Sequence, residues 1–453
     1  MSDSTTTTTK TQPLIFQPKP ERAAPPSTVG VIGWMRQNLF SNVSNTLLTI
    51  VGAYIVYVFL AWVLNWAVFN AVWQAENRRE CLDLVGRSGA CWPGVIQWFD
   101  NLIYGLYPKD QIWRINLGFL ALILWVAPLW FPKVQSKVAI GITAVMLYPF
   151  LASYFFLGGD KGVLWMALIS AGLTGLIWVW LTVFTELFHG KSFTRMMGEI
   201  LGASGKSEEE QLKFGRLSLI GVFAIAVVLV SQWELSFVST RQWGGLFLTL
   251  VISGIGITFS LPSGILLALG RRSTMPLIRL MCTGFIELFR SVPLITILFM
   301  FNTMLPLFLP VGVEVNQLVR AIVAVCLFAA AYMAEVIRGG LQAIPKGQYE
   351  AAAAMGLGYW QATTLIIMPQ ALKIMIPTIV GNFIGLFKDT TLVSIIGLFD
   401  LLNMARSVGE DTRWLGLFIE PFFFITLIYF FFCFLMSQYS INLERKLEAG
   451  ARR

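Results

Sequence analysis

Long apolar stretches alternate with short polar segments along most of the 453-residue chain. A bilayer core of roughly 30 Å needs about 20 apolar residues for each helix that crosses it. Stretches of this kind predict ten transmembrane helices, at 45–70, 113–131, 138–157, 163–188, 216–233, 243–269, 292–310, 318–337, 374–399 and 415–438. The pattern therefore predicts an all-α, polytopic membrane protein.

The segment before the first apolar stretch has a different composition. It contains a threonine tract and several prolines, which is typical of disordered chain. No basic start, apolar middle and small-residue cleavage site occur together there, so a signal peptide is not expected. We expect residues 1–40 to form a disordered cytoplasmic tail.

The charge distribution sets the orientation of the predicted helices. Only 13% of residues are charged and 56% are hydrophobic, so the net charge of +8 is not a nucleic-acid signal. Lys and Arg cluster in alternate loops, which places both termini in the cytoplasm. Residues 71–112 would be a periplasmic loop, although they carry several basic residues balanced by acidic ones. The bilayer is thus an expected partner, and nucleic acid is not.

The periplasmic loop contains Cys81 and Cys91. An oxidising compartment permits a disulfide between them, although two free thiols are the alternative. The stretch 93–108 is amphipathic and is expected to lie on the membrane surface. Five cysteines and the single histidine, His189, do not indicate a metal site.

One segment resembles a nucleotide-binding loop but lacks its essential residues. The sequence ILGASGKS at 200–207 ends like the motif G-x-x-x-x-G-K-[ST], yet Ile200 stands where the first glycine must be. Three glutamates follow at 208–210 and would repel phosphate. We therefore expect no ATP site, and no cofactor, in this chain.

The segment KGQYEAAAAMGLGYWQATTLIIMPQAL at 346–372 is too polar to cross a bilayer and too apolar for a plain solvated loop. Its alanine-rich start favours a helix that Gly356 interrupts, and a second helical piece is expected to run to Pro369. This predicts a helix–turn–helix across the cytoplasmic membrane face. A well-packed interfacial loop is the alternative.

The spacing within this segment carries a family resemblance. Glu350, Ala351, Ala352, Gly356, Ile366 and Pro369 resemble the E-A-A-x3-G-x9-I-x-L-P loop of membrane subunits of bacterial binding-protein-dependent ABC importers, with methionine at 368 in place of leucine. The resemblance implies that these residues form a coupling helix, within a cytoplasmic loop at 340–372, that inserts into a groove of a partner ATPase. ATP and Mg²⁺ would be bound by that partner.

Further stretches between 243 and 450 look like the polar-amino-acid permease branch, among them FIELFRSVPLI at 285–295 and NFIGLFKDTTLVSIIG at 382–397. The resemblance implies a type I importer permease core at 241–445. The additional transmembrane region at 41–240 is similar to that of the longer general L-amino-acid permeases. The implied partners are cytoplasmic ATPase subunits, a second permease subunit that is either a related chain or a second copy, a periplasmic amino-acid-binding protein and an L-amino acid. This chain itself would not be an enzyme.

Polar residues on one predicted helix are candidates for the solute path. Thr378, Asn382, Gly385 and Asp389 fall within about 60° of one another on a helix. Such a stripe faces either other helices or a wet cavity. In a cavity, Asp389 could bind an α-ammonium group. Further candidates for the path are Lys388, Glu287 and Arg290.

Two other classes of function remain open on composition alone. An ion-coupled secondary transporter needs acidic residues within the membrane, and Glu287, Glu335 and Asp389 would qualify. A passive pore or scaffold is the third class, but it would not explain the coupling-loop pattern. That pattern favours an ATP-driven importer of L-amino acids in the bacterial inner membrane.

Overall fold

The predicted all-α membrane fold is confirmed in a computed structural model, which describes residues 30–86, 88–159, 162–189, 193–198, 200, 208–310 and 312–451. Within these ranges, eight helices are long and apolar enough to cross a membrane. A ninth candidate is the bent pair Pro276–Ser291 and Leu294–Phe308, whose halves meet at 104°. The helix predicted at 216–233 has a shorter apolar part, Leu217–Gln232. The P-loop-like segment falls outside the described ranges, except for Ile200.

The disordered tail predicted for residues 1–40 extends too far, because a helix begins at Gly30. Residues Gly30–Asn38 form helix α1 and are not disordered chain. This segment, GVIGWMRQN, contains four large apolar residues and no proline, so nothing in it interrupts helical turns.

The chain divides into two compact units, and the first comprises residues 1–72 and 84–90. Its main element is α2 (Val43–Leu64), which ends in a π-helical turn, η1 (Asn65–Phe69). The Asn42 side chain caps the start of α2 by accepting a hydrogen bond from the Asn45 N–H at 2.7 Å. None of the α2 residues is buried, and apolar side chains cover all its faces, as expected of a helix in contact with lipid.

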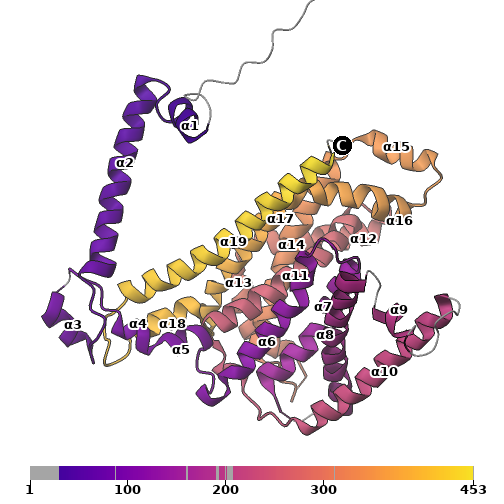
Figure 1. Ribbon diagram of the computed structural model, residues 1–453, viewed down its shortest axis with the longest axis horizontal. Helices are drawn as coiled ribbons and strands as arrows, with labels where there is room; N and C mark the ends of the chain where they lie inside the picture. Colours follow the sequence, from indigo (N-terminus) through magenta and orange to yellow (C-terminus); the bar gives the residue numbers. More distant parts are fainter. Residues whose placement is uncertain are drawn as a thin grey trace, which may run out of the picture. The chain divides into compact units, whose positions relative to one another are not determined.

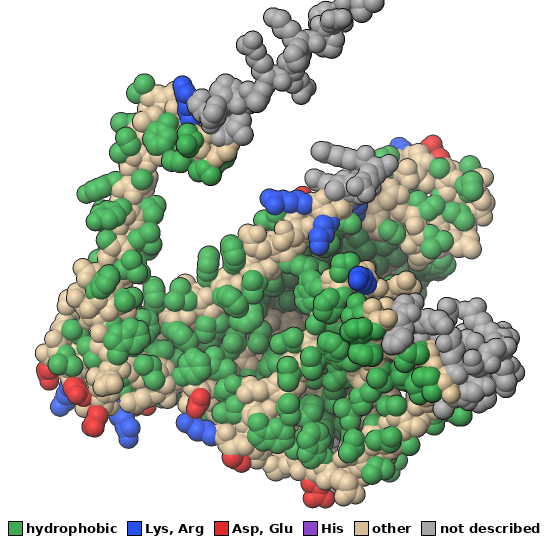
Figure 2. Space-filling view, viewed as in Figure 1, with side chains coloured by type: hydrophobic (Ala, Val, Ile, Leu, Met, Phe, Trp, Pro, Cys, Tyr) green, Lys and Arg blue, Asp and Glu red, His purple; other side chains and the backbone are tan. Residues whose placement is uncertain are grey.

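The second unit contains the rest of the chain, and its first half is a group of long helices. Helices α6, α7 and α8 pack against one another, and α8 also packs against α10 (Figure 1). Their bounds are α6 Ile112–Val126, α7 Lys137–Leu157, α8 Val163–His189, α9 Phe193–Gly198 and α10 Glu208–Gln232. Figure 2 shows hydrophobic side chains over most of the face that these helices present.

The second half of this unit is built around a row of long helices. Helix α11 packs along α14, α14 along α17, and α17 along α19 (Figure 1). The amphipathic helix α12 crosses the ends of α11 and α14. The bounds are α11 Gly245–Arg271, α12 Pro276–Ser291, α13 Leu294–Phe299, α14 Gln317–Ala343, α17 Met368–Asp389, α18 Leu401–Val408 and α19 Ile419–Ala451.

One aromatic cluster joins the two halves of the second unit. Phe247, near the start of α11, is buried against Phe156 of α7 at 4.9 Å between ring centroids, and against Phe119 of α6 at 6.0 Å. Tyr107 and Trp243 also contact this ring. Each aromatic pair of this kind stabilises by about 0.5–1.5 kcal/mol beyond its buried area. The additional helices α6 and α7 therefore share one core with α11.

A buried arginine fixes the end of α7. The Arg114 Nε–H donates to the Phe155 carbonyl at 2.8 Å, and an η-nitrogen donates to the Ser236 carbonyl at 3.0 Å. These carbonyls lie at the C-terminal end of α7 and in the loop before α11, where backbone acceptors lack helical partners. Arg114 therefore satisfies them and holds this corner together.

Residues 73–83 and 91–104 pack against residues 409–420, and we call this arrangement the clasp. It contains the short helices α4 (Pro93–Gln97) and α5 (Phe99–Tyr104) and most of α3 (Arg78–Val85). The last two residues of α3 belong to the first unit and not to the clasp. Cys81 and Cys91, the pair proposed from the sequence, are joined by a disulfide.

Hydrogen bonds connect residues 73–83 and 91–104 of the clasp to its other segment, residues 409–420. The Arg78 backbone N–H donates to the Arg413 carbonyl at 3.0 Å, and the Cys91 N–H donates to the Glu420 carboxylate at 3.0 Å. The Trp98 indole donates to Asp411 at 3.1 Å. A loop from the additional region is thus fastened to the connection between α18 and α19.

Candidate functional site

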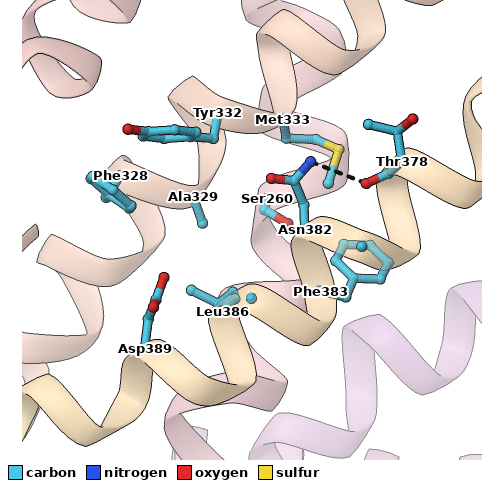
Figure 3. Close-up of a pocket in the computed structure, with 12 residues that line it drawn as sticks. Ser260, Phe328, Ala329, Tyr332, Met333, Thr378, Asn382, Phe383, Leu386 and Asp389 are labelled. Carbon is cyan, nitrogen blue, oxygen red and sulfur yellow. Dashed lines mark hydrogen bonds between the residues drawn. The ribbon is translucent and has the colours of Figure 1, made fainter. Parts of the chain in front are cut away.

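A cavity of about 440 Å³ lies between α11, α14 and α17. Its walls are mainly apolar, with a few polar groups, as is common in binding sites for small molecules. The lining residues are Ser260, Phe328, Ala329, Tyr332, Met333, Thr378, Gly381, Asn382, Phe383, Gly385, Leu386 and Asp389. Figure 3 shows Tyr332 and Asn382 on opposite walls, with Asp389 farther along α17.

The four residues of the predicted polar stripe all line this cavity. Thr378, Asn382, Gly385 and Asp389 come from consecutive turns of α17, which is why their spacing places them on one face. The Asn382 amide donates to the Thr378 carbonyl at 3.1 Å (Figure 3). Its amide oxygen remains on the cavity side as an acceptor.

Asp389 is the one charged residue among those that line the cavity. Its carboxylate accepts no hydrogen bond from any residue that the structure describes. A carboxylate in an apolar site is costly unless it is paired or hydrogen-bonded. This position is therefore suited to a cationic group supplied by a ligand.

The other three path candidates lie outside the cavity. Lys388 is exposed and does not line it, because a step of one residue turns the side chain by about 100° around the helix. Glu287 and Arg290 are on α12, and both belong to an ion-pair cluster beside the cavity. The sequence motif that contains them gave no sign of this pairing.

That cluster is centred on Glu335, whose side chain is only 14% exposed. Arg271 of α11 binds Glu335 at 2.6 Å and Glu287 at 2.9 Å. Arg338, one turn along α14, binds Glu335 at 2.7 Å, and Arg290 lies 3.6 Å from it. The Glu335 carboxylate, a candidate ion ligand in the sequence, is therefore already paired with arginines. Arg271 could not be identified from the sequence because its partners lie on two other helices, whereas Arg338 lies at the i,i+3 spacing from Glu335 that brings side chains together on one helix face.

The segment 346–372 contains two helices around a glycine turn. Helix α15 (Lys346–Ala354) contains Glu350, Ala351 and Ala352, and only the last of these is buried. Gly356 has a φ of +72°, a conformation that suits glycine, and no atom lies within 4 Å of where a Cβ would be. Gly356 is therefore needed for the turn and not for packing within this chain.

The second helical piece does not stop at Pro369. Helix α16 (Tyr359–Ala362) continues through a π-helical turn, η8 (Thr363–Ile367), directly into α17, where Pro369 lies in the first turn. The prediction of a break there was wrong, because the wide π-turn and an N-terminal position both tolerate a residue without an N–H. Ile366 packs against the cluster around Ile367, whereas Pro369 is exposed.

Large apolar side chains are exposed on the same segment. Met355, Tyr359, Trp360 and Leu365 are each more than half exposed. The turn and the exposed sides of α15 and α16 thus present apolar and small side chains that no other described part of the chain covers. Exposed apolar patches of this kind mark contact surfaces.

Comparison with known proteins identifies the class of this fold. Residues 260–449 match the family described as binding-protein-dependent transport system inner membrane component. The inner membrane amino-acid ABC transporter permease protein YhdY of Escherichia coli (strain K12) is 41% identical over 431 residues, covering 95% of this chain and 97% of that protein.

The glutamate/glutamine/aspartate/asparagine transport system permease protein BztC of Rhodobacter capsulatus is 42% identical, with 95% of this chain and 97% of that protein covered. A shorter relative, the probable glutamine ABC transporter permease protein GlnP of Bacillus subtilis (strain 168), is 35% identical over 48% of this chain and 95% of its own length.

Among solved structures, the crystal structure of an amino acid ABC transporter with histidines is 31% identical, covering 44% of this chain and 90% of that chain with a TM-score of 0.40. The family description and the two full-length relatives support the ABC importer interpretation over an ion-coupled carrier. The chain therefore belongs to the binding-protein-dependent transport system inner membrane component family, as a multi-pass amino-acid ABC transporter permease subunit.

Proposed function

We propose that this chain moves L-amino acids, most readily acidic and amide ones, from the periplasm into the cytoplasm. The observation that carries the proposal is the 42% identity, over nearly its whole length, to a glutamate/glutamine/aspartate/asparagine permease. The cavity supports it, since a space of about 440 Å³ accommodates a single amino acid.

Within this proposal, the cavity is part of the solute path. Asp389 binds the α-ammonium group that all α-amino acids share, and Thr378 and Asn382 offer neutral hydrogen-bonding groups. The cavity is not fully enclosed, and a second permease subunit, either a related chain or a second copy, would complete its walls.

Cytoplasmic ATPase subunits supply the energy, and they bind the ATP and Mg²⁺. We assign their docking surface to the segment 346–372, where Glu350, Ala351 and the exposed apolar residues Met355 and Trp360 face away from the rest of the chain. A periplasmic amino-acid-binding protein delivers the solute. Both termini are cytoplasmic, in agreement with the placement of Lys and Arg in alternate loops.

Uptake measurements test the choice of substrate. The chain and its partner subunits are expressed in cells that lack their own acidic and amide amino-acid importers. Radiolabelled glutamate, glutamine, aspartate, asparagine, histidine, leucine and arginine are then supplied separately. We expect the first four to be taken up fastest. Preferential uptake of leucine or of arginine would contradict the proposed substrate class.

A further inference from the structure

Polar contacts, joined at one point by the backbone between Arg272 and Arg271, connect the coupling segment to the wall of the cavity. It begins at Tyr349 of α15, whose hydroxyl accepts a hydrogen bond from Arg272 at 3.1 Å. The same hydroxyl donates to the Leu341 carbonyl of α14 at 3.1 Å, and the Arg272 guanidinium lies over the Tyr349 ring at 5.5 Å. Helix α15 is thus fastened to the ends of both α11 and α14.

The next step is from Arg272 to its neighbour Arg271, at the C-terminal end of α11. Arg271 binds two carboxylates on two other helices, Glu287 of α12 at 2.9 Å and Glu335 of α14 at 2.6 Å. A movement of α15 that displaces Arg272 would therefore move Arg271 relative to both partners.

The last step reaches the cavity through α12. Arg290, 3.6 Å from Glu335, lies over the ring of Tyr332 with 5.6 Å to the ring centroid. Tyr332 forms part of the cavity wall (Figure 3). The contacts thus run from Tyr349 through the arginines and Glu335 to a residue that faces the solute.

The packing around this chain of contacts transmits small displacements. At Gly270, a Cβ atom would lie 2.3 Å from the sulfur of Cys282, so α11 and α12 touch at this point. At Gly264, a Cβ atom would lie 2.7 Å from the Met333 side chain on α14. Close-packed helices cannot absorb a shift by local compression and must move together.

Shielding from water makes the central ion pairs stronger than ordinary surface pairs. Glu335 is 14% exposed and Arg271 is 26% exposed, whereas the surface pair Arg406–Glu410 is 68% and 60% exposed. Exposed pairs contribute little. A partly buried carboxylate left without its partner is costly, so Glu335 favours arrangements that keep Arg271 in place.

We propose that this cluster is a relay, in which Arg271 and Glu335 are positioning residues that make the shape of the cavity depend on the position of the coupling segment. The relay rests on the proposed function, because it needs an ATPase that moves α15. The relay would have two states, one with Arg271 bound to both carboxylates, and one in which α15 has shifted and Arg290 of α12 has moved relative to the Tyr332 ring on α14.

The test uses the complete complex, purified with its ATPase, permease and binding-protein partners and reconstituted in lipid vesicles. The readout is the number of amino acids transported per ATP hydrolysed. A purely structural role would reduce the amount of assembled complex and leave this ratio unchanged. Tyr349→Phe removes one hydroxyl and keeps the ring, so it should assemble normally. We expect it to lower the ratio about fivefold, the lower end of typical coupling energies.

Matched variants separate the relay from general effects. Tyr104→Phe removes another hydroxyl hydrogen bond, to Asn116, outside the relay and should keep the wild-type ratio. Arg338→Gln removes a partner of Glu335 that lies on the same helix, so it should change the ratio less than Arg271→Gln, which breaks a link between helices. The double variant Tyr349→Phe with Arg271→Gln should have the ratio of Arg271→Gln alone, because both changes interrupt one path.

Several outcomes would overturn the relay. These are a wild-type ratio in Tyr349→Phe, equal effects of Arg338→Gln and Arg271→Gln, or effects that multiply in the double variant. If Arg271→Gln fails to assemble, Tyr349→Phe alone decides. Failure of the wild-type complex to transport any amino acid would instead contradict the proposed function.

Discussion

Asp389 gives an otherwise neutral cavity a single negative charge, and this has a direct consequence for substrate selection. All α-amino acids carry an α-ammonium group, so one carboxylate can bind this group in every member of the class, while it repels the side-chain carboxylates of glutamate and aspartate. Selection among side chains must then come from the neutral and aromatic wall, which includes Thr378, Asn382 and Tyr332.

The first prediction concerns Asp389→Asn, which keeps the shape of the side chain and removes its charge. Loss of a charge-assisted contact of about 1.5–3 kcal/mol should weaken uptake roughly tenfold to a hundredfold, with assembly intact. The measurement is the concentration dependence of uptake of radiolabelled glutamine. Glu410→Gln, an exposed carboxylate paired with Arg406, is the control and should behave as wild type. Unchanged uptake by Asp389→Asn would show that Asp389 does not bind the solute on its path through the cavity.

The second prediction concerns Asp400, a fully buried residue that caps the start of α18 by accepting hydrogen bonds from the Leu402 and Asn403 N–H groups. Burial raises the pKa of its carboxyl to about 7, against the partial opposition of these hydrogen bonds. Because the folded-state pKa lies above the unfolded one, the protonated form is favoured by folding. Its contribution to stability is complete below about pH 4 and is lost as the pH rises towards 7.

Relative to the wild type, Asp400→Asn should therefore be more stable at pH 8 than at pH 4 in thermal unfolding of the detergent-solubilised protein. Asparagine keeps only one of the two oxygens that accept the cap hydrogen bonds, so the other bond is lost at both pH values and the pH-dependent part of the stability difference is the test. The upper limit of the gain is roughly 4 kcal/mol, from about three pKa units. Thermal unfolding of both proteins across this pH range is the measurement, and a stability difference that does not vary with pH would contradict the burial argument.

At the scale of elements, the coupling segment is a turn set by one glycine between two helices. The family resemblance implied that Gly356 belongs to a surface that inserts into a groove of a partner ATPase. Gly356 instead has the backbone conformation of a left-handed turn and open space around it. The two explanations make different predictions for substitutions at this position.

The third prediction uses that difference. Gly356→Val should disturb the turn, at a cost of about 1–2 kcal/mol, and lower the ATPase-coupled transport rate. Gly356→Asn should be close to wild type, because asparagine adopts this conformation more readily than other residues. Transport assays on both variants, normalised to assembled complex, make the comparison. Equal damage by both would point to close packing against a partner and not to the turn.

The fourth prediction concerns the clasp. Closing a loop of 10 residues by the Cys81–Cys91 disulfide should stabilise the folded protein on the order of 3 kcal/mol. Non-reducing mass spectrometry should recover the linked peptides. The double change of both cysteines to serine should lower the unfolding temperature, while Cys433→Ser, at a free cysteine, should not. Free thiols at 81 and 91 in membranes prepared without reductant would contradict this prediction.

At the scale of the molecule, the sequence predicts the helices better than their connections. Apolar stretches of about 20 residues reveal the spans directly, because lipid requires them. The α17 stripe was also predictable, since helical spacing alone places Asn382 and Asp389 on one face. The continuous helix through Pro369 was not, because the π-turn before it leaves no mark in the hydrophobic pattern.

Contacts between distant segments could not be predicted from the sequence, for a different reason. The Arg271–Glu335 pair joins residues 64 positions apart, and Phe247 gathers aromatic rings from α6 and α7. Such pairings depend on how helices pack, which a single sequence does not specify. They also give the additional helices α6 and α7 a structural role, since Phe119 and Phe156 pack against Phe247 near the start of α11.

As the permease of an ATP-driven importer, this chain should transport its solute only when ATP is available to its partners. The most direct measurement is uptake of radiolabelled glutamate into vesicles that contain the complete complex, with the binding protein outside and ATP enclosed. We expect uptake that requires ATP and continues when an ionophore removes the proton and sodium gradients. Uptake that proceeds without ATP and stops when the ionophore is added would instead show that transport is coupled to an ion gradient.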